Sequence, residues 1–122
     1  MTDPFDLDVA VLHRAYAAFN ARDLTAALAT MAEDVTWPRA FQGDFVSGQG
    51  AVREYWTEQW SQIDPHVEPQ AFKREDSSRI LVEVHQVVRD LQGAVLNDQR
   101  VGHRFTIRDG LIRAMEVVSP GP

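Results

Sequence analysis

The sequence contains no cysteine, and its eleven arginines are accompanied by a single lysine, Lys73. Without cysteine there are no disulfides, thiolate metal sites or thiol nucleophiles. No stretch approaches the roughly 20 apolar residues that a membrane-spanning helix needs, and the acidic start MTDPFDLD lacks the apolar run of a secretory signal. The arginines are scattered and the formal net charge is −6, which does not favour nucleic-acid binding. We therefore expect a cytoplasmic protein without a nucleic-acid or membrane partner.

The length of 122 residues is enough for one modest hydrophobic core but not for two. A hydrophobic fraction of 44% and a charged fraction of 25% are those of an ordinary soluble globular protein. We expect a single domain over residues 1–122, with short flexible ends at residues 1–6 and 119–122.

The first half of the chain shows helical spacing of apolar residues. From Leu7 to Asn20 they recur every three or four positions, the ARDL segment interrupts this run, and Asp23 is placed to cap a second helix beginning at LTAAL. A third helix is predicted in AVREYWTEQW. A strand around Trp37 separates the second and third helices and ends near Pro38. The glycine-rich QGDFVSGQG is predicted to be a loop, and DPHVEP a connector.

In the second half the hydrophobic period changes to two. AFKRED, RILVEVHQVVRDL, AVLNDQRVGHRFTIR and LIRAMEVV are predicted to be strands, with turns at LQGA and at Asp109-Gly110. Three helices followed by an antiparallel meander indicate an α+β fold, in which the helices close one face of a curved antiparallel sheet.

The segments YAAFNARDLTAALATMAEDVTW and HRFTIRDGLI carry a resemblance that extends over residues 7–118. In them the helix breaks at Asn20, Arg22 and Asp23, an acidic turn at Glu33-Asp34 leads to the Trp37 strand, and a final hairpin runs from His103 to Ile112. This arrangement resembles the SnoaL-like branch of the nuclear transport factor 2-like superfamily, which includes ketosteroid isomerases, polyketide cyclases, limonene epoxide hydrolase and scytalone dehydratase. The resemblance implies a cone-shaped barrel around a pocket that the helices cap. It does not select one chemistry, because this fold hosts many.

The steroid-isomerase pattern does not transfer residue by residue. Its tyrosine position falls on Ala15, one residue before Tyr16, its first-strand base position falls near Arg39, and its late acid position falls on His103. The epoxide-hydrolase pattern needs two aspartates and an arginine. This sequence has residues of those types in Asp98, Arg100 and Arg39, but their positions do not match the pattern. The ending MEVVSPGP also replaces the aromatic-then-aspartate ending that is usual in the SnoaL-like group.

His103 is the main candidate for chemistry. On an extended strand it shares a face with Val101, Phe105 and Ile107, which places an ionisable ring on the inward side. A histidine there can take and return a proton near neutral pH, and the alternative is a structural histidine bonded once in the cavity wall. His85 is expected on the outward face of its strand, since Val82, Val84, Gln86 and Val88 form the apolar set.

We expect Tyr16 and Arg39 to stabilise oxyanion charge beside His103, and the alternatives are a structural hydroxyl and a solvated arginine at the rim. For the aromatic residues, the alternative to lining a pocket is ordinary core packing. Asp44 lies in the glycine-rich loop, where it is either a carboxylate on a lid over the cavity or, as we favour, a solvated loop residue. The residues expected to line a ligand pocket are Trp37, Trp56, Trp60, Phe105, Val101 and Phe19.

The leading hypothesis is a small cofactor-independent enzyme that isomerises, cyclises or dehydrates an apolar oxygenated molecule by proton transfer. No metal is expected, because His66, His85 and His103 lack ligand spacing, and no cofactor motif is present. The partners expected are a small apolar molecule and a second copy of the chain, paired through the sheet. Two alternatives remain open, a non-catalytic binding module and a dimeric scaffold with a vestigial cavity.

Overall fold

The computed structural model describes residues 3–39 and 42–119, which form three helices and six strands. In chain order these are α1 (Pro4–Asn20), α2 (Leu24–Leu28), β1 (Met31–Arg39), β2 (Asp44–Ser47), α3 (Gln49–Trp60), β3 (Ile63–Arg74), β4 (Arg79–Asp90), β5 (Val95–Arg108) and β6 (Leu111–Val118). The predicted α+β class is confirmed. None of the helices within this described part of the chain has the length and apolarity to cross a membrane.

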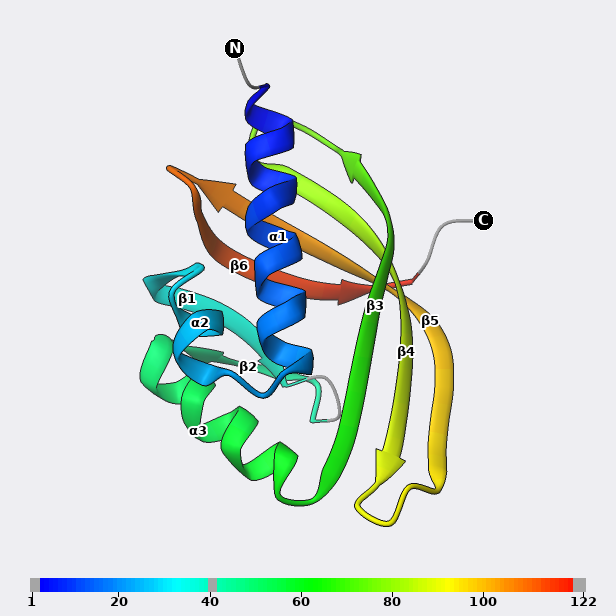
Figure 1. The fold of residues 1–122 in the computed structure, drawn as a ribbon. Helices are drawn as coiled ribbons and strands as arrows, with labels where there is room; N and C mark the ends of the chain where they lie inside the picture. The colour runs from blue at the N-terminus through cyan, green and yellow to red at the C-terminus, as the bar shows by residue number, and fades with distance from the viewer. Residues whose placement is uncertain (1–2, 40–41, 120–122) are drawn as a thin grey trace.

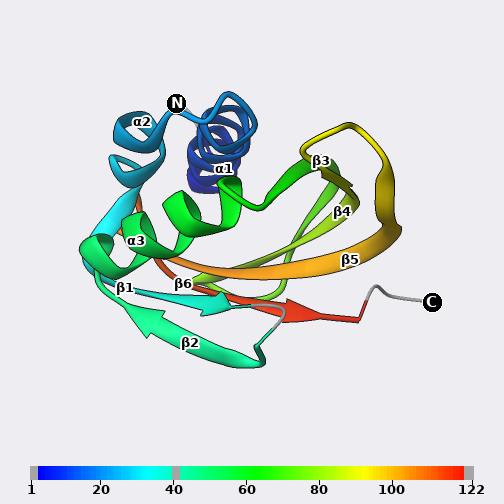
Figure 2. The same ribbon diagram turned by 90° about the horizontal axis from the view of Figure 1, so that it is seen from below.

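The six strands form one curved sheet in the order β2-β1-β6-β5-β4-β3. Every neighbouring pair is antiparallel except β1 and β6, which run parallel. The sheet bends around the three helices (Figures 1 and 2), and α1 crosses its concave side. Since β2 and β3 lie at opposite edges, the sheet is curved as predicted but does not close into a complete barrel.

Local sequence signals explain where the first two helices begin. The Asp3 side chain accepts a hydrogen bond from the Phe5 backbone N–H at 2.8 Å, and Pro4 occupies the first turn, where its missing N–H has no cost. Helix α1 therefore begins three residues before the predicted Leu7 and includes part of the segment expected to be a flexible end. The predicted cap of α2 is confirmed, because Asp23 accepts from the Ala26 N–H at 3.1 Å.

Three local predictions were wrong. The glycine-rich segment contains strand β2, which pairs with the end of β1 between glycines of positive φ, Gly43 and Gly48. The predicted connector DPHVEP is part of β3, where prolines are tolerated because β3 is an edge strand. Glu33-Asp34, expected as an acidic turn, are exposed residues within β1, at a point where the β1–β6 register shifts.

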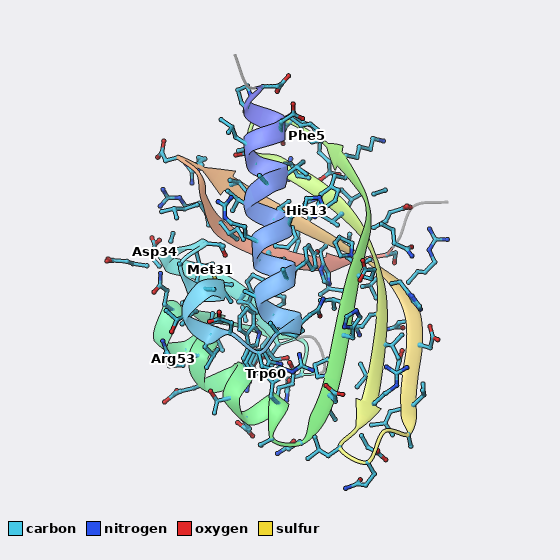
Figure 3. The ribbon with its side chains drawn as sticks, viewed as in Figure 1. Phe5, His13, Met31, Asp34, Arg53 and Trp60 are labelled. Atoms are coloured by element: carbon cyan, nitrogen blue, oxygen red, sulfur yellow. The ribbon has the colours of Figure 1, made fainter. Side chains whose placement is uncertain are left out.

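The core lies between the concave face of the sheet and the helices. Its fully buried members come from both halves of the chain and include Leu12, Val35, Val52, Ile80, Val82, Val84 and Ile112. Helix α1 contributes Leu12 and Tyr16 to this core. His13, on the side of α1 toward β3 (Figure 3), is exposed, and its ring lies 4.8 Å from that of Phe72. The predicted Asp109-Gly110 turn is confirmed, since both residues have the positive φ of a type I′ hairpin.

Candidate functional site

A cavity of about 90 Å³ lies between α1, α3 and the concave face of the sheet. The described residues that line it are Ala15, Tyr16, Phe19, Met31, Trp37, Pro38, Tyr55, Trp56, Gln59, Pro65, Val67, Gln86, Val88, His103, Phe105, Met115 and Val117. None of these carries a formal charge at neutral pH when His103 is neutral. An apolar wall with a few polar groups is typical of a small-molecule site.

Four aromatic rings form the wall of this cavity. Trp37 meets Trp56 edge to face at a centroid distance of 5.3 Å, and Phe19 meets Trp56 in the same way at 5.1 Å. Phe105 lies 6.2 Å from Trp37. These distances are those of favourable aromatic pairs, so the rings hold one another in place and present flat apolar surface to a ligand.

The polar centre of the cavity is a hydrogen bond between Tyr16 and His103. Tyr16 Oη lies 2.7 Å from His103 Nδ1, and each residue is 6% exposed. Tyr16 is presented by α1 and His103 by β5, on the face that also carries Phe105. Within residues 3–39 and 42–119, no side chain or backbone group makes a hydrogen bond to His103 Nε2, so this ring nitrogen can bond to a ligand.

Burial keeps both members of the pair neutral. Desolvation lowers the pKa of His103 from 6.5 to about 4, and it raises the pKa of the Tyr16 hydroxyl well above its usual value. A neutral imidazole has one donor and one acceptor nitrogen. The hydrogen bond to Tyr16 occupies Nδ1, which leaves Nε2 as either an acceptor or a donor toward the cavity.

The lowered pKa of His103 predicts a loss of stability in acid. Between pH 6.5 and about 4 the unfolded chain protonates this histidine while the folded chain does not, so the free energy of unfolding falls as the pH falls. The shift corresponds to about 3 kcal/mol lost between pH 7 and pH 4. Denaturant unfolding of wild type and His103→Gln across this range measures it. The acidic groups common to both cancel in the difference, and equal pH dependence in the two proteins would contradict the prediction.

Arg39 does not line the cavity, contrary to expectation. Its guanidinium forms a two-point contact with Asp44, with Nε 2.7 Å from Oδ1. The reason is the β1–β2 register, which places Asp44 directly opposite Arg39. Asp44 is therefore an ion-pair partner on a short strand, not a lid carboxylate on a loop.

Trp60 and Val101 also lie outside the lining. Trp60 packs behind it, against Phe19 at 5.4 Å and Trp56 at 5.7 Å, near the C-terminal end of α1 (Figure 3). Val101 is buried in the core opposite Val84. The remaining residues expected in the pocket, Trp37, Trp56, Phe105 and Phe19, do line it.

His85 points away from the cavity, as the alternation predicted. Its Nε2 lies 2.7 Å from Asp98 Oδ1 on the outer side of the sheet. Within the described ranges, which omit residues 1–2, 40–41 and 120–122, no three histidine or carboxylate side chains are grouped so that they could hold a metal ion.

Sequence reasoning missed the polar residues Tyr55, Gln59 and Gln86 in the lining. The Gln59 amide donates to Tyr55 Oη at 3.1 Å, and the two residues are four positions apart on α3, so they lie on one side of the helix. Gln86 was assigned to the inward face of its strand, and a glutamine among three valines was the signal that could have marked it.

Comparisons with known proteins show what this chain is similar to. TerC, whose crystal structure contains polyporic acid, is 24% identical with a TM-score of 0.81, over 93% of this chain and 92% of TerC. A Xanthomonas campestris protein provisionally named a polyketide cyclase is 23% identical with a TM-score of 0.81, over 97% of this chain and 93% of that one. RV0760c from Mycobacterium tuberculosis, solved in complex with estradiol-17beta-hemisuccinate, is 17% identical with a TM-score of 0.78, over 91% and 92% of the two chains.

A comparison with curated protein sequences gives no significant match. The profile of the SnoaL-like domain matches residues 12–115, which is most of the chain and includes both Tyr16 and His103. The chain therefore belongs to the SnoaL-like family.

Proposed function

We propose that this protein binds a neutral, apolar, oxygen-bearing ring compound in its aromatic cavity and transfers a proton within it, without a cofactor. The observation that carries this proposal is the Tyr16–His103 hydrogen bond, buried in a cavity whose described lining is mostly aromatic and aliphatic and carries no carboxylate or cation. Isomerisation, cyclisation and dehydration all begin with such a transfer.

In the proposed mechanism, His103 Nδ1–H donates to Tyr16 Oη, which leaves the Nε2 lone pair facing the ligand. Nε2 removes a proton from a carbon next to the ligand carbonyl. The Tyr16 O–H, whose oxygen already accepts from His103, donates to the carbonyl oxygen as it becomes an enolate. The protonated ring then returns the proton to another atom of the ligand.

The low pKa of free His103 is compatible with this role. Burial disfavours the imidazolium because the empty site offers it no counter-charge. An enolate formed beside the ring supplies that counter-charge. The imidazole of His103 therefore becomes a stronger base as the ligand loses its proton. In the free enzyme His103 stays unprotonated, and ready to accept, at every pH above about 4.

Two solved structures of similar fold support a ring compound as the ligand. Polyporic acid in TerC and estradiol-17beta-hemisuccinate in RV0760c are both ring systems that bear oxygen. Both also carry an acidic group, whereas the described lining of this cavity holds no cation, and for this reason we propose a neutral ligand here.

A thermal-shift experiment with 2-tetralone, 2-naphthol and 1-naphthoate tests the binding. A ligand at 100 times its dissociation constant stabilises the fold by about 2.7 kcal/mol, which raises the Tm of a domain of this size by about 10 °C. We expect this shift with the ketone and the phenol but not with the carboxylate, because none of the described residues that line the cavity is a cation. His103→Ala should remove most of it. If none of the compounds raises the Tm, or if the naphthoate alone does, the proposal is wrong.

A second candidate function is ligand binding without chemistry. It is favoured by the absence of aspartate and glutamate from the described lining of the cavity, since a carboxylate is the usual alternative base. A binding module would hold 2-tetralone with the same His103 dependence and leave its carbon-bound hydrogens in place.

Homodimer formation through the outer face of the sheet stays a prediction. That face carries Arg104, whose guanidinium is paired within the chain to Glu75 at 2.6 Å and to Glu116 at 2.9 Å. Arg104 is therefore already occupied by ion pairs within the chain.

A further inference from the structure

The concave wall of the sheet continues past the aromatic cavity along β4 and β5. His103 lies opposite Val82, and the following cross-strand pairs are Val101 with Val84, Gln99 with Gln86, and Asn97 with Val88. Residues directly opposite each other in an antiparallel pair share one face. All of these side chains therefore belong to the inward face, which extends beyond α3 along the β4–β5 hairpin (Figures 1 and 2).

The outer part of this wall carries three uncharged amides instead of valines. Gln86 lines the cavity, and its carboxamide makes no hydrogen bond to any residue in the described part of the chain. Gln99, directly opposite, is exposed. In the next row Asn97 Oδ1 is buried without a hydrogen-bond partner. Of the three, only Asn97 has a buried atom without a partner, which costs stability. Gln86 is partly exposed and Gln99 is exposed, so their amides remain open to hydrogen bonds from a ligand.

The distance between His103 and the Gln86–Gln99 row sets the length of a ligand that can contact both. Gln99 and His103 are four residues apart on β5, which corresponds to about 13 Å along an extended strand. Gln86 lies directly opposite Gln99 on β4, so the same distance along the sheet separates His103 from the Gln86–Gln99 row. Two linked or several fused rings fill it, with one end in the aromatic cavity and the other at Gln86.

The carboxamides at the outer end of the wall are suited to a neutral oxygen atom of a ligand. A carboxamide donates and accepts hydrogen bonds but offers no charge to an acid or an amine. Arg22, which contacts the carbonyl of Pro65 beside the cavity at 2.7 Å, is already paired with Asp64.

We infer that Gln86 is a specificity-determining residue, which selects elongated neutral ligands carrying a second hydroxyl or carbonyl oxygen at the end opposite to the one held by His103 and Tyr16. This inference rests on the proposed function, because it requires the first oxygen to lie at His103. Gln99 lies directly opposite Gln86 on the neighbouring strand and adds a second amide to the same end of the site.

Calorimetric titration with 4-phenylphenol and 4,4′-biphenol tests the inference. The two probes share their ring system and differ only in the second hydroxyl. One additional hydrogen bond is expected to strengthen binding about fivefold, and the two equivalent ends of the diol add a statistical factor of two. Wild type should therefore prefer the diol about tenfold. In Gln86→Met, a substitution of similar shape, the ratio of the two affinities should fall to the statistical twofold.

Gln92→Met is the matched control, because Gln92 is exposed in the β4–β5 turn, and it should keep the wild-type preference. If 4-phenylphenol binds in a His103-dependent manner but wild type shows only the statistical preference, the inference is overturned and the proposed function stands. A full preference that survives Gln86→Met overturns it in the same way. Failure of both phenols to bind wild type overturns both proposals.

Discussion

Replacing His103 with glutamine is expected to slow enzyme-catalysed exchange of the carbon-bound hydrogens of 2-tetralone about 10²–10⁴-fold, the range contributed by one positioned base. Glutamine can still hydrogen-bond to Tyr16 Oη, so the cavity keeps its shape and its polar partner. It cannot accept a proton. Proton NMR in D₂O follows the loss of the ketone's α-hydrogens and reports proton abstraction without a known product.

His85→Gln is the matched control, because His85 is exposed, lies on the outer side of the sheet and contacts Asp98 instead of the cavity. It should exchange 2-tetralone at the wild-type rate. Since His103 is unprotonated above about pH 4, wild-type exchange attributable to this base should be flat between pH 5 and pH 8. Exchange by His103→Gln within a few-fold of wild type, with 2-tetralone still bound, would leave the non-catalytic binding function as the better account.

Replacing Phe105 with alanine is expected to lower the free energy of unfolding by about 3–5 kcal/mol, the usual cost of removing a buried aromatic ring. Phe105 is 2% exposed. Its ring lies 5.9 Å from Tyr16, 6.2 Å from Trp37 and 6.1 Å from His103. The substitution enlarges the cavity and removes the edge contacts that orient the Tyr16–His103 pair. For a domain of this length the loss corresponds to a Tm lower by about 10–20 °C.

Phe45→Ala provides the comparison, since Phe45 is 54% exposed on β2 and its removal should change the free energy of unfolding by less than about 1 kcal/mol. Urea unfolding at pH 7 measures both variants. Similar losses in the two would show that Phe105 is not part of the core that supports the cavity.

The sequence by itself determined those features that depend on neighbours in the chain. Helical spacing located α1 and α3, the Asp23 cap located α2, and the Asp109-Gly110 pair located the last hairpin. Alternation with period two was enough to place His103 inward and His85 outward, because successive side chains on a strand point to opposite faces. The family resemblance then placed these elements in the correct α+β fold.

Only the tertiary structure decided which side chains meet. Tyr16 and His103 are 87 residues apart, and no local pattern predicts that α1 brings one to hydrogen-bonding distance of the other. Arg39 was expected in the pocket because its strand alternation allowed it, but the pairing of β2 with β1 places Asp44 opposite and holds it outside. The direction in which a side chain points depends on backbone geometry over a few residues. The side chains that it contacts depend on strand register and packing across the whole chain. The sequence therefore predicted the inward histidine and a role for Tyr16 beside it, and the fold supplied the direct hydrogen bond between the two.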